Sequence, residues 1–78
     1  MNIVIYTKSN CPLCTTAKQL LKSKGLEYEE VSFDNDPMRQ AEFHVAYPDV
    51  RQMPQIFIGG QRVGGLAGLQ AALKQVGL

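Results

Sequence analysis

Residues 3–14 read IVIYTKSNCPLC, an apolar run followed by a short polar break and two cysteines three positions apart. Residues 3–6 are all β-branched or aromatic, which predicts a strand buried on both faces. Pro12 suits the first turn of a helix, because the N–H that proline lacks would have no partner there. The segment therefore predicts a strand followed by a helix that begins beside Cys11.

Beyond this segment, apolar spacing and turn residues predict the remaining elements. The first helix carries the stripe Leu13, Ala17, Leu20, Leu21 and Lys24, with Gly25 after it. A strand is expected at 27–33, and a second helix then starts with Asp36 as N-cap and Pro37 as its first residue. We expect Met38, Ala41, Glu42 and Val45 to mark one face of that helix.

The last third of the sequence predicts a hairpin and a final helix. Strands at 55–58 and 61–63 flank Gly59-Gly60, which favours a tight turn of the primed types. The final helix follows Gly64-Gly65 and is marked by Leu66, Leu69, Leu73 and Val76, with Gly77 after it. The order β-α-β-α-β-β-α predicts an α/β fold, a mixed four-stranded sheet flanked by helices on both faces, in one domain over residues 1–78.

Composition excludes several classes of function. Eight basic and seven acidic side chains give a net charge of +1, so charge gives no argument for binding nucleic acid or an anionic membrane. No apolar run approaches the ~20 residues that span a bilayer, and no signal-peptide pattern opens the sequence. We expect a monomeric, cytoplasmic protein.

The two cysteines are expected to be reactive rather than structural. A disulfide between Cys11 and Cys14 would close a tiny loop and add little stability. Unpaired N–H groups and the positive end of the helix dipole favour a thiolate at Cys11, and Lys8 adds positive charge nearby. Cys11 is thus expected to attack a disulfide, and Cys14 to resolve the mixed disulfide.

Metal binding is the main alternative for such a pair. Structural zinc needs four ligands, and the sequence offers one histidine, His44, and no further cysteine. We therefore expect no metal site, and interpret His44 as a surface or half-buried residue rather than a general base.

Met53-Pro54 and Gly64-Gly65 allow two interpretations each. Pro54 starts a strand, and physical reasoning alone favours a trans turn proline because only ~5% of X–Pro bonds are cis. The glycine pair permits positive φ or close backbone approach, and the following helix N-terminus could hold a carboxylate. A simple bend between strand and helix explains the pair equally well.

Three motifs in order, YTKSNCPLC at 6–14, MPQIFI at 53–58 and Gly64-Gly65, resemble the glutaredoxins. The resemblance implies a thioredoxin-like fold and a thiol–disulfide oxidoreductase that reduces protein disulfides and glutathione mixed disulfides. Glutathione would be the electron donor and co-substrate, with no bound cofactor. The resemblance also implies that Pro54 is cis and faces the cysteines.

By the same resemblance, glutathione would lie between the helix after Cys11, the Pro54 loop and the turn at Gly65. The residues implied to contact it are Lys8, Leu13, Met53, Pro54, Gly65, Leu66 and Ala67. Lys8 would meet a carboxylate, the Met53 backbone would pair with the cysteinyl part, and residues 65–67 would face the γ-glutamyl end. Glutaredoxins usually have Tyr or Phe at Leu13, often Thr at Gln52, and an acid near Ala67-Gly68 to pair with the γ-glutamyl ammonium.

Two related functions remain open. Arg51-Gln52-Met53-Pro54 also resembles glutaredoxin-like redoxins that thioredoxin reductase reduces and that donate electrons to ribonucleotide reductase. Those proteins rarely have Pro12 or the Gly64-Gly65 pair. The other possibility is a module that binds an iron–sulfur cluster across a dimer, through Cys11 and two glutathiones. Pro12 opposes it, since cluster-binding glutaredoxins mostly lack proline there.

Overall fold

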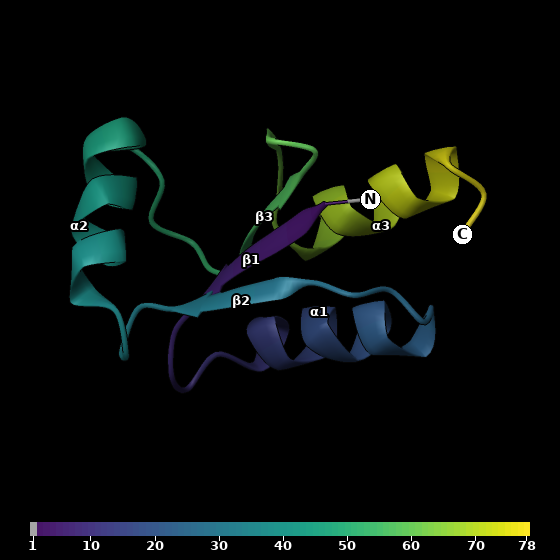
Figure 1. The fold of residues 1–78 in the computed structure, drawn as a ribbon, viewed down its shortest axis with the longest axis horizontal. Helices are drawn as coiled ribbons and strands as arrows, with labels where there is room; N and C mark the ends of the chain where they lie inside the picture. Colours follow the sequence, from purple (N-terminus) through teal and green to yellow (C-terminus); the bar gives the residue numbers. More distant parts are fainter. Residues whose placement is uncertain (1) are drawn as a thin grey trace.

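The computed structural model describes residues 2–78 and has the predicted order of strands and helices (Figure 1). The elements are β1 (Ile3–Thr7), α1 (Pro12–Ser23), β2 (Glu29–Ser32), α2 (Pro37–Ala46), β3 (Gln55–Ile58), β4 (Gln61–Gly64) and α3 (Leu66–Gln75). Strand β2 is shorter than the expected 27–33, because β1 pairs with it only from Val4 to Thr7. Among the described residues, no helix has both the length and the apolar character to cross a membrane.

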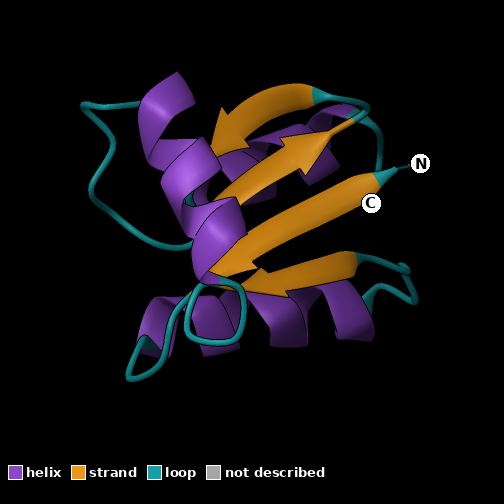
Figure 2. Ribbon diagram, turned by 60° about the vertical axis from the view of Figure 1, so that its left-hand side comes forward, coloured by secondary structure: helices purple, strands orange, loops and turns teal. Residues whose placement is uncertain are grey.

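The four strands form one mixed sheet in the order β2-β1-β3-β4 (Figure 2). Helix α1 connects β1 to β2, which run parallel, as a crossover connection requires. Strand β3 is antiparallel to both β1 and β4, and Ile5 of β1 lies opposite Ile56. The turn between β3 and β4 has φ of +59° at Gly59 and +82° at Gly60, which confirms the predicted primed turn.

The main core lies between the sheet and helices α1 and α3. Alternation along β1 turns Ile3 and Ile5 to this face, where they meet Ile56 of β3. The buried residues of this cluster are Ile3, Ile5, Ala17, Leu21, Ile56, Leu69 and Leu73. Burying each leucine or isoleucine is worth about 1.5–3 kcal/mol, so this face contributes most of the apolar driving force.

The opposite face is covered only near the ends of β1 and β2, where α2 lies (Figure 1). Val4 and Tyr6 on this face are half-buried, so the prediction that residues 3–6 are buried on both faces is wrong. One short helix does not cover the length of the sheet. The buried residues here are Cys14, Phe33, Phe43 and Met53, so this smaller cluster lies directly at the cysteine pair.

The face of α2 marked by Met38, Ala41, Glu42 and Val45 is not the face that packs on the sheet, since Met38 is 77% and Val45 83% exposed. Phe43 is the buried residue of α2, and its ring lies 5.0 Å from Tyr6 and 5.1 Å from Tyr47 between centroids. Aromatic rings bury more area than aliphatic side chains and attract one another edge to face. These rings therefore decide which side of α2 faces the sheet.

Candidate functional site

Topology brings the three sequence motifs to one end of the sheet. Strand β1 ends just before Cys11, and β3, which is antiparallel to β1, begins there with Gln55 opposite Tyr6. Strand β4 runs back antiparallel to β3 and ends at the same edge with Gly64 opposite Ile56. Cys11, Met53-Pro54 and Gly64-Gly65 are thus neighbours, although up to 54 positions separate them in sequence (65 minus 11).

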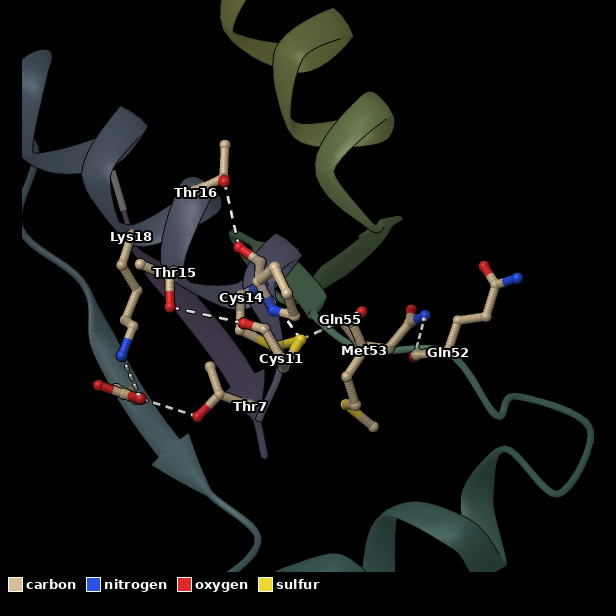
Figure 3. The surroundings of a disulfide bond; sticks show 11 residues. Thr7, Cys11, Cys14, Thr15, Thr16, Lys18, Gln52, Met53 and Gln55 are labelled. Atoms are coloured by element: carbon tan, nitrogen blue, oxygen red, sulfur yellow. Dashed lines mark hydrogen bonds and ion pairs between the residues drawn. A yellow bond between two sulfur atoms is a disulfide. The ribbon is translucent and has the colours of Figure 1, made fainter. Parts of the chain in front are cut away.

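Cys11 is the N-cap of α1 and Pro12 its first residue, as predicted. Figure 3 shows Cys11 and Cys14 joined by a disulfide, with Cα atoms 5.3 Å apart. The backbone N–H of Cys14 donates to Sγ of Cys11 at 3.1 Å. In the reduced protein the same N–H would stabilise a thiolate, because a charged acceptor strengthens a hydrogen bond.

The two sulfur atoms differ in access. Cys14 is 2% exposed and packs with Phe33 and Phe43, whereas Cys11 is half-buried at the surface. Only Cys11 is open to an incoming disulfide, so the geometry agrees with Cys11 as attacking thiol and Cys14 as resolving thiol. The predicted stripe of α1 included Leu13, which is instead 54% exposed, because Cys14, Ala17 and Leu21 form the buried face of the helix.

The Met53–Pro54 peptide bond is cis. The trans form, which the base rate of X–Pro bonds favoured, is therefore wrong, and the cis form implied by the resemblance to the glutaredoxins is confirmed. The carbonyl oxygen of Met53 lies 3.6 Å from Sγ of Cys11 (Figure 3). Both Met53 and Pro54 are buried. A substrate bonded to Cys11 would therefore lie against the backbone of this loop.

A groove of about 400 Å³ lies between Leu13 of α1, the Met53-Pro54 loop and the N-terminus of α3. It brings together six of the seven residues that the glutaredoxin motifs implied for glutathione, namely Leu13, Met53, Pro54, Gly65, Leu66 and Ala67. Gln52 and Gln70 complete the lining. Gln70 was missed because it is one turn beyond the Gly64-Gly65 motif, but its i+3 spacing from Ala67 places it on the same helix face.

Lys8, which was also expected to contact glutathione, does not line this groove. Its side chain is exposed on the loop between β1 and α1, three residues before Cys11. From there it can approach a bound anion only by moving its flexible stem, so it would act as a point charge rather than a fixed ligand.

The glycines around the start of α3 have different roles, since Gly64 has a φ of +100° and Gly68 allows close backbone approach. A Cβ at Gly65 would lie 3.4 Å from the carbonyl oxygen of Pro54. At Gly68 a Cβ would overlap the carbonyl oxygen of Val63 and lie 2.8 Å from its carbonyl carbon. Gly65 as N-cap offers no side chain to the first N–H groups of α3, and no acidic residue lies in that turn. These N–H groups therefore face the groove without a side-chain partner.

A polar contact that sequence reasoning missed ties α1 to β2 beside the cysteines. The hydroxyl of Thr7 donates to Oε2 of Glu30 at 2.8 Å, and Nζ of Lys18 lies 3.0 Å from the same oxygen (Figure 3). Partial burial of Glu30 opposes its ionisation, but Thr7 and Lys18 outweigh that effect, so the pKa of Glu30 is lowered. Thr7 itself is buried.

His44 is exposed and lies against the rings of Phe33 and Phe43, as expected of a surface residue.

Comparison with known proteins agrees with this geometry. The family model described as Glutaredoxin matches residues 3–63. Glutaredoxin 3 of Escherichia coli is 39% identical over 77 residues, which cover 99% of this chain and 92% of that protein.

Two solved structures share the fold. The buckwheat glutaredoxin–glutathione complex superposes with a TM-score of 0.78 at 25% identity, over 95% of this chain and 69% of that one. The glutaredoxin-like protein NrdH-redoxin from Escherichia coli superposes with a TM-score of 0.72 at 25% identity, over 92% of each chain. The architecture is therefore thioredoxin-like, and the chain, with its Cys11–Cys14 dithiol at a helix N-terminus, belongs to the glutaredoxin family of thiol–disulfide oxidoreductases.

Proposed function

We propose that this protein uses glutathione to reduce protein disulfides and glutathione mixed disulfides through Cys11 and Cys14. The groove beside Cys11, lined by Met53, Pro54 and the residues from Gly65 to Ala67, carries this proposal. Its volume of about 400 Å³ lies within the ~300–1,000 Å³ typical of small-molecule sites. The buckwheat glutaredoxin, whose structure contains glutathione, supports it through a shared fold.

The thiol and both carboxylates of glutathione have suitable partners in or beside the groove. The cysteinyl sulfur would bond to Cys11, with the cysteinyl backbone against Met53. The γ-glutamyl carboxylate would accept hydrogen bonds from the first N–H groups of α3, where the helix dipole favours an anion. Lys8 would meet the glycine carboxylate as a mobile positive charge.

The chemistry needs no bound cofactor. The Cys11 thiolate attacks the glutathione sulfur of a mixed disulfide, so the protein thiolate leaves and Cys11 carries the glutathione. A second glutathione thiolate then attacks that bond, releasing oxidised glutathione and the Cys11 thiolate. With a protein disulfide, Cys11 forms the mixed disulfide and Cys14 displaces the substrate, which leaves the Cys11–Cys14 disulfide for two glutathiones to reduce.

A second candidate donor is thioredoxin reductase, with ribonucleotide reductase as electron acceptor. Ala67 and Gly68 offer no carboxylate to the γ-glutamyl ammonium, which favours a weak role for glutathione. The structural likeness to NrdH-redoxin points the same way. The groove beside Cys11 favours glutathione as the donor, whereas the missing acid near Ala67-Gly68 favours thioredoxin reductase.

We further propose a monomer that works in the cytoplasm on disulfide-containing proteins. Cys11 and Cys14 supply both electrons within one chain, so no partner subunit is needed. Absorption above 400 nm after anaerobic purification would indicate instead an iron–sulfur cluster.

A comparison of electron donors tests the proposal. The oxidised protein is mixed with NADPH and either glutathione plus glutathione reductase, or thioredoxin reductase, and NADPH consumption is followed. We expect reduction with the glutathione system and little with thioredoxin reductase. The reverse result would assign the protein to the redoxin group.

A further inference from the structure

A second groove adjoins the first through Gln52, which lines both. It has a volume of about 360 Å³ and is polar, with two arginines among its residues. The lining is Asp49, Val50, Arg51, Gln52, Gln55 and Arg62. None of the glutathione contacts proposed above uses this groove.

Arg62 is held in place on two sides. Its guanidinium lies 5.2 Å from the centre of the Tyr47 ring, and Nη1 donates to Oε1 of Gln55 at 3.3 Å. The side chain of Gln55 is itself fixed, because the residue is only 5% exposed and its Nε2 donates to the carbonyl oxygen of Gln52 at 2.9 Å. Stacking and a buried amide thus position a cation whose remaining N–H groups have no hydrogen-bond partner among residues 2–78.

We propose that this groove is a subsite for an acidic side chain of the polypeptide that carries the substrate disulfide, with Arg62 as the residue that binds it. A guanidinium presents paired N–H donors that match a carboxylate. Arg51 adds a second positive charge, and Asp49 on the rim offsets one of the two. The proposal rests on the proposed disulfide reductase function and names a specificity determinant for its protein substrates.

The position of the subsite fits a polypeptide better than glutathione. The carbonyl oxygen of Met53 lies 3.6 Å from Sγ of Cys11. The preceding residue, Gln52, lies at the boundary of the two grooves. An extended chain advances about 3.3–3.6 Å per residue, so an acidic residue two to four positions from the substrate cysteine reaches roughly 7–14 Å from it, and this range is the one to test. Glutathione has one residue on each side of its cysteine, and the contacts proposed for these two residues lie in the first groove and at Lys8.

The test uses pre-reduced protein in single-turnover reactions, which need no electron donor. Synthetic peptides carry a disulfide-closed loop and either Asp, Asn or Lys at two to four positions outside one cysteine. We expect the second-order rate constant for the best Asp peptide to exceed that of its Lys counterpart roughly three- to tenfold at low salt, as for a partly exposed charge pair.

Variants at Arg62 then test whether this residue causes the preference for the Asp peptide over the Lys peptide. Arg62→Gln should abolish it and leave the rate for the Asn peptide unchanged, Arg62→Lys should keep part of it, and Lys74→Gln on α3 should keep all of it. No preference in the wild type, a preference that survives Arg62→Gln, equal loss in Lys74→Gln, or an Arg62→Gln variant slowed equally on every peptide would overturn the proposal. Because no donor is present, each result is independent of whether glutathione or thioredoxin reductase supplies the electrons.

Discussion

Ala67 lies exposed in the first turn of α3 and lines the groove beside Gly65. Ala67→Asp places a carboxylate where the γ-glutamyl ammonium would lie, and an acidic residue in a first helical turn is compatible with the fold. A charge-assisted hydrogen bond is worth ~1.5–3 kcal/mol, less in a wet groove, so the Michaelis constant for glutathione should fall up to about tenfold. The maximal rate should change little because Cys11 is untouched. An unchanged constant would remove this placement of the γ-glutamyl group.

Gly68 shows why the structure is needed to choose that position. The sequence indicates that an acid is missing near Ala67-Gly68, and from the sequence position 68 is the first choice for restoring it and position 67 the second. A side chain there would overlap the backbone carbonyl of Val63, so α3 could not keep its distance from β4. Motif spacing predicts the residues of the site, but only coordinates show which of them have room for a side chain.

At the scale of elements, Glu30 couples β2 to α1 through Thr7 and Lys18. Because folding lowers the pKa of Glu30 from 4.5, its ionised form stabilises the fold above that value, and the contribution disappears as the pH falls through the folded pKa. Glu30→Gln should therefore lower the free energy of unfolding at pH 7, by at most about 1 kcal/mol for so exposed a pair. Near pH 3 the difference from wild type should shrink.

Urea unfolding of both proteins at pH 7, 5 and 3 measures this dependence. Glu42→Gln, on the exposed side of α2, is the matched control and should behave alike at all three values. A Glu30→Gln deficit that is constant or grows at pH 3 would contradict the role given to the ionised carboxylate.

Elements were predictable from the sequence to different degrees. The cap and turn residues located α1, α2 and the hairpin correctly, because Pro12, Asp36-Pro37 and Gly59-Gly60 act through local backbone geometry. The packing face of α2 was not predictable from aliphatic spacing, since it is determined by aromatic rings that come from β1, α2, β3 and two loops. The Lys18–Glu30 pair spans 12 positions and has no local signal.

At the scale of the whole molecule, α1 contributes one face to the core and one to the groove, so substitutions on the two faces should affect stability and function separately. Leu21 is fully buried in the main core, so Leu21→Ala should cost ~2–5 kcal/mol. For a domain of this size that lowers Tm by about 8 °C or more. Leu13→Ala, at an exposed position in the groove, should leave Tm nearly unchanged and raise the Michaelis constant for glutathione.

Thermal melts and the glutathione-coupled assay on both variants test this division. A large loss of Tm in Leu13→Ala would mean that Leu13 packs as a core residue after all. The location of the site could be predicted from the sequence, because the order and direction of the strands bring Cys11, Pro54 and Gly65 to one end of the sheet. The volume and remaining lining of the groove there, Gln70 included, depend on how the elements pack.

The most direct test of the account is the turnover of a glutathionylated substrate by Cys11→Ser and Cys14→Ser, with NADPH, glutathione and glutathione reductase. Cys11 is the accessible sulfur beside the Met53 carbonyl and Cys14 is buried, so the two variants should behave differently. Cys14→Ser should retain turnover, because one thiol suffices for a glutathione mixed disulfide, and Cys11→Ser should have none. Equal and complete loss in both variants, or activity that persists in Cys11→Ser, would contradict Cys11 as the attacking thiol.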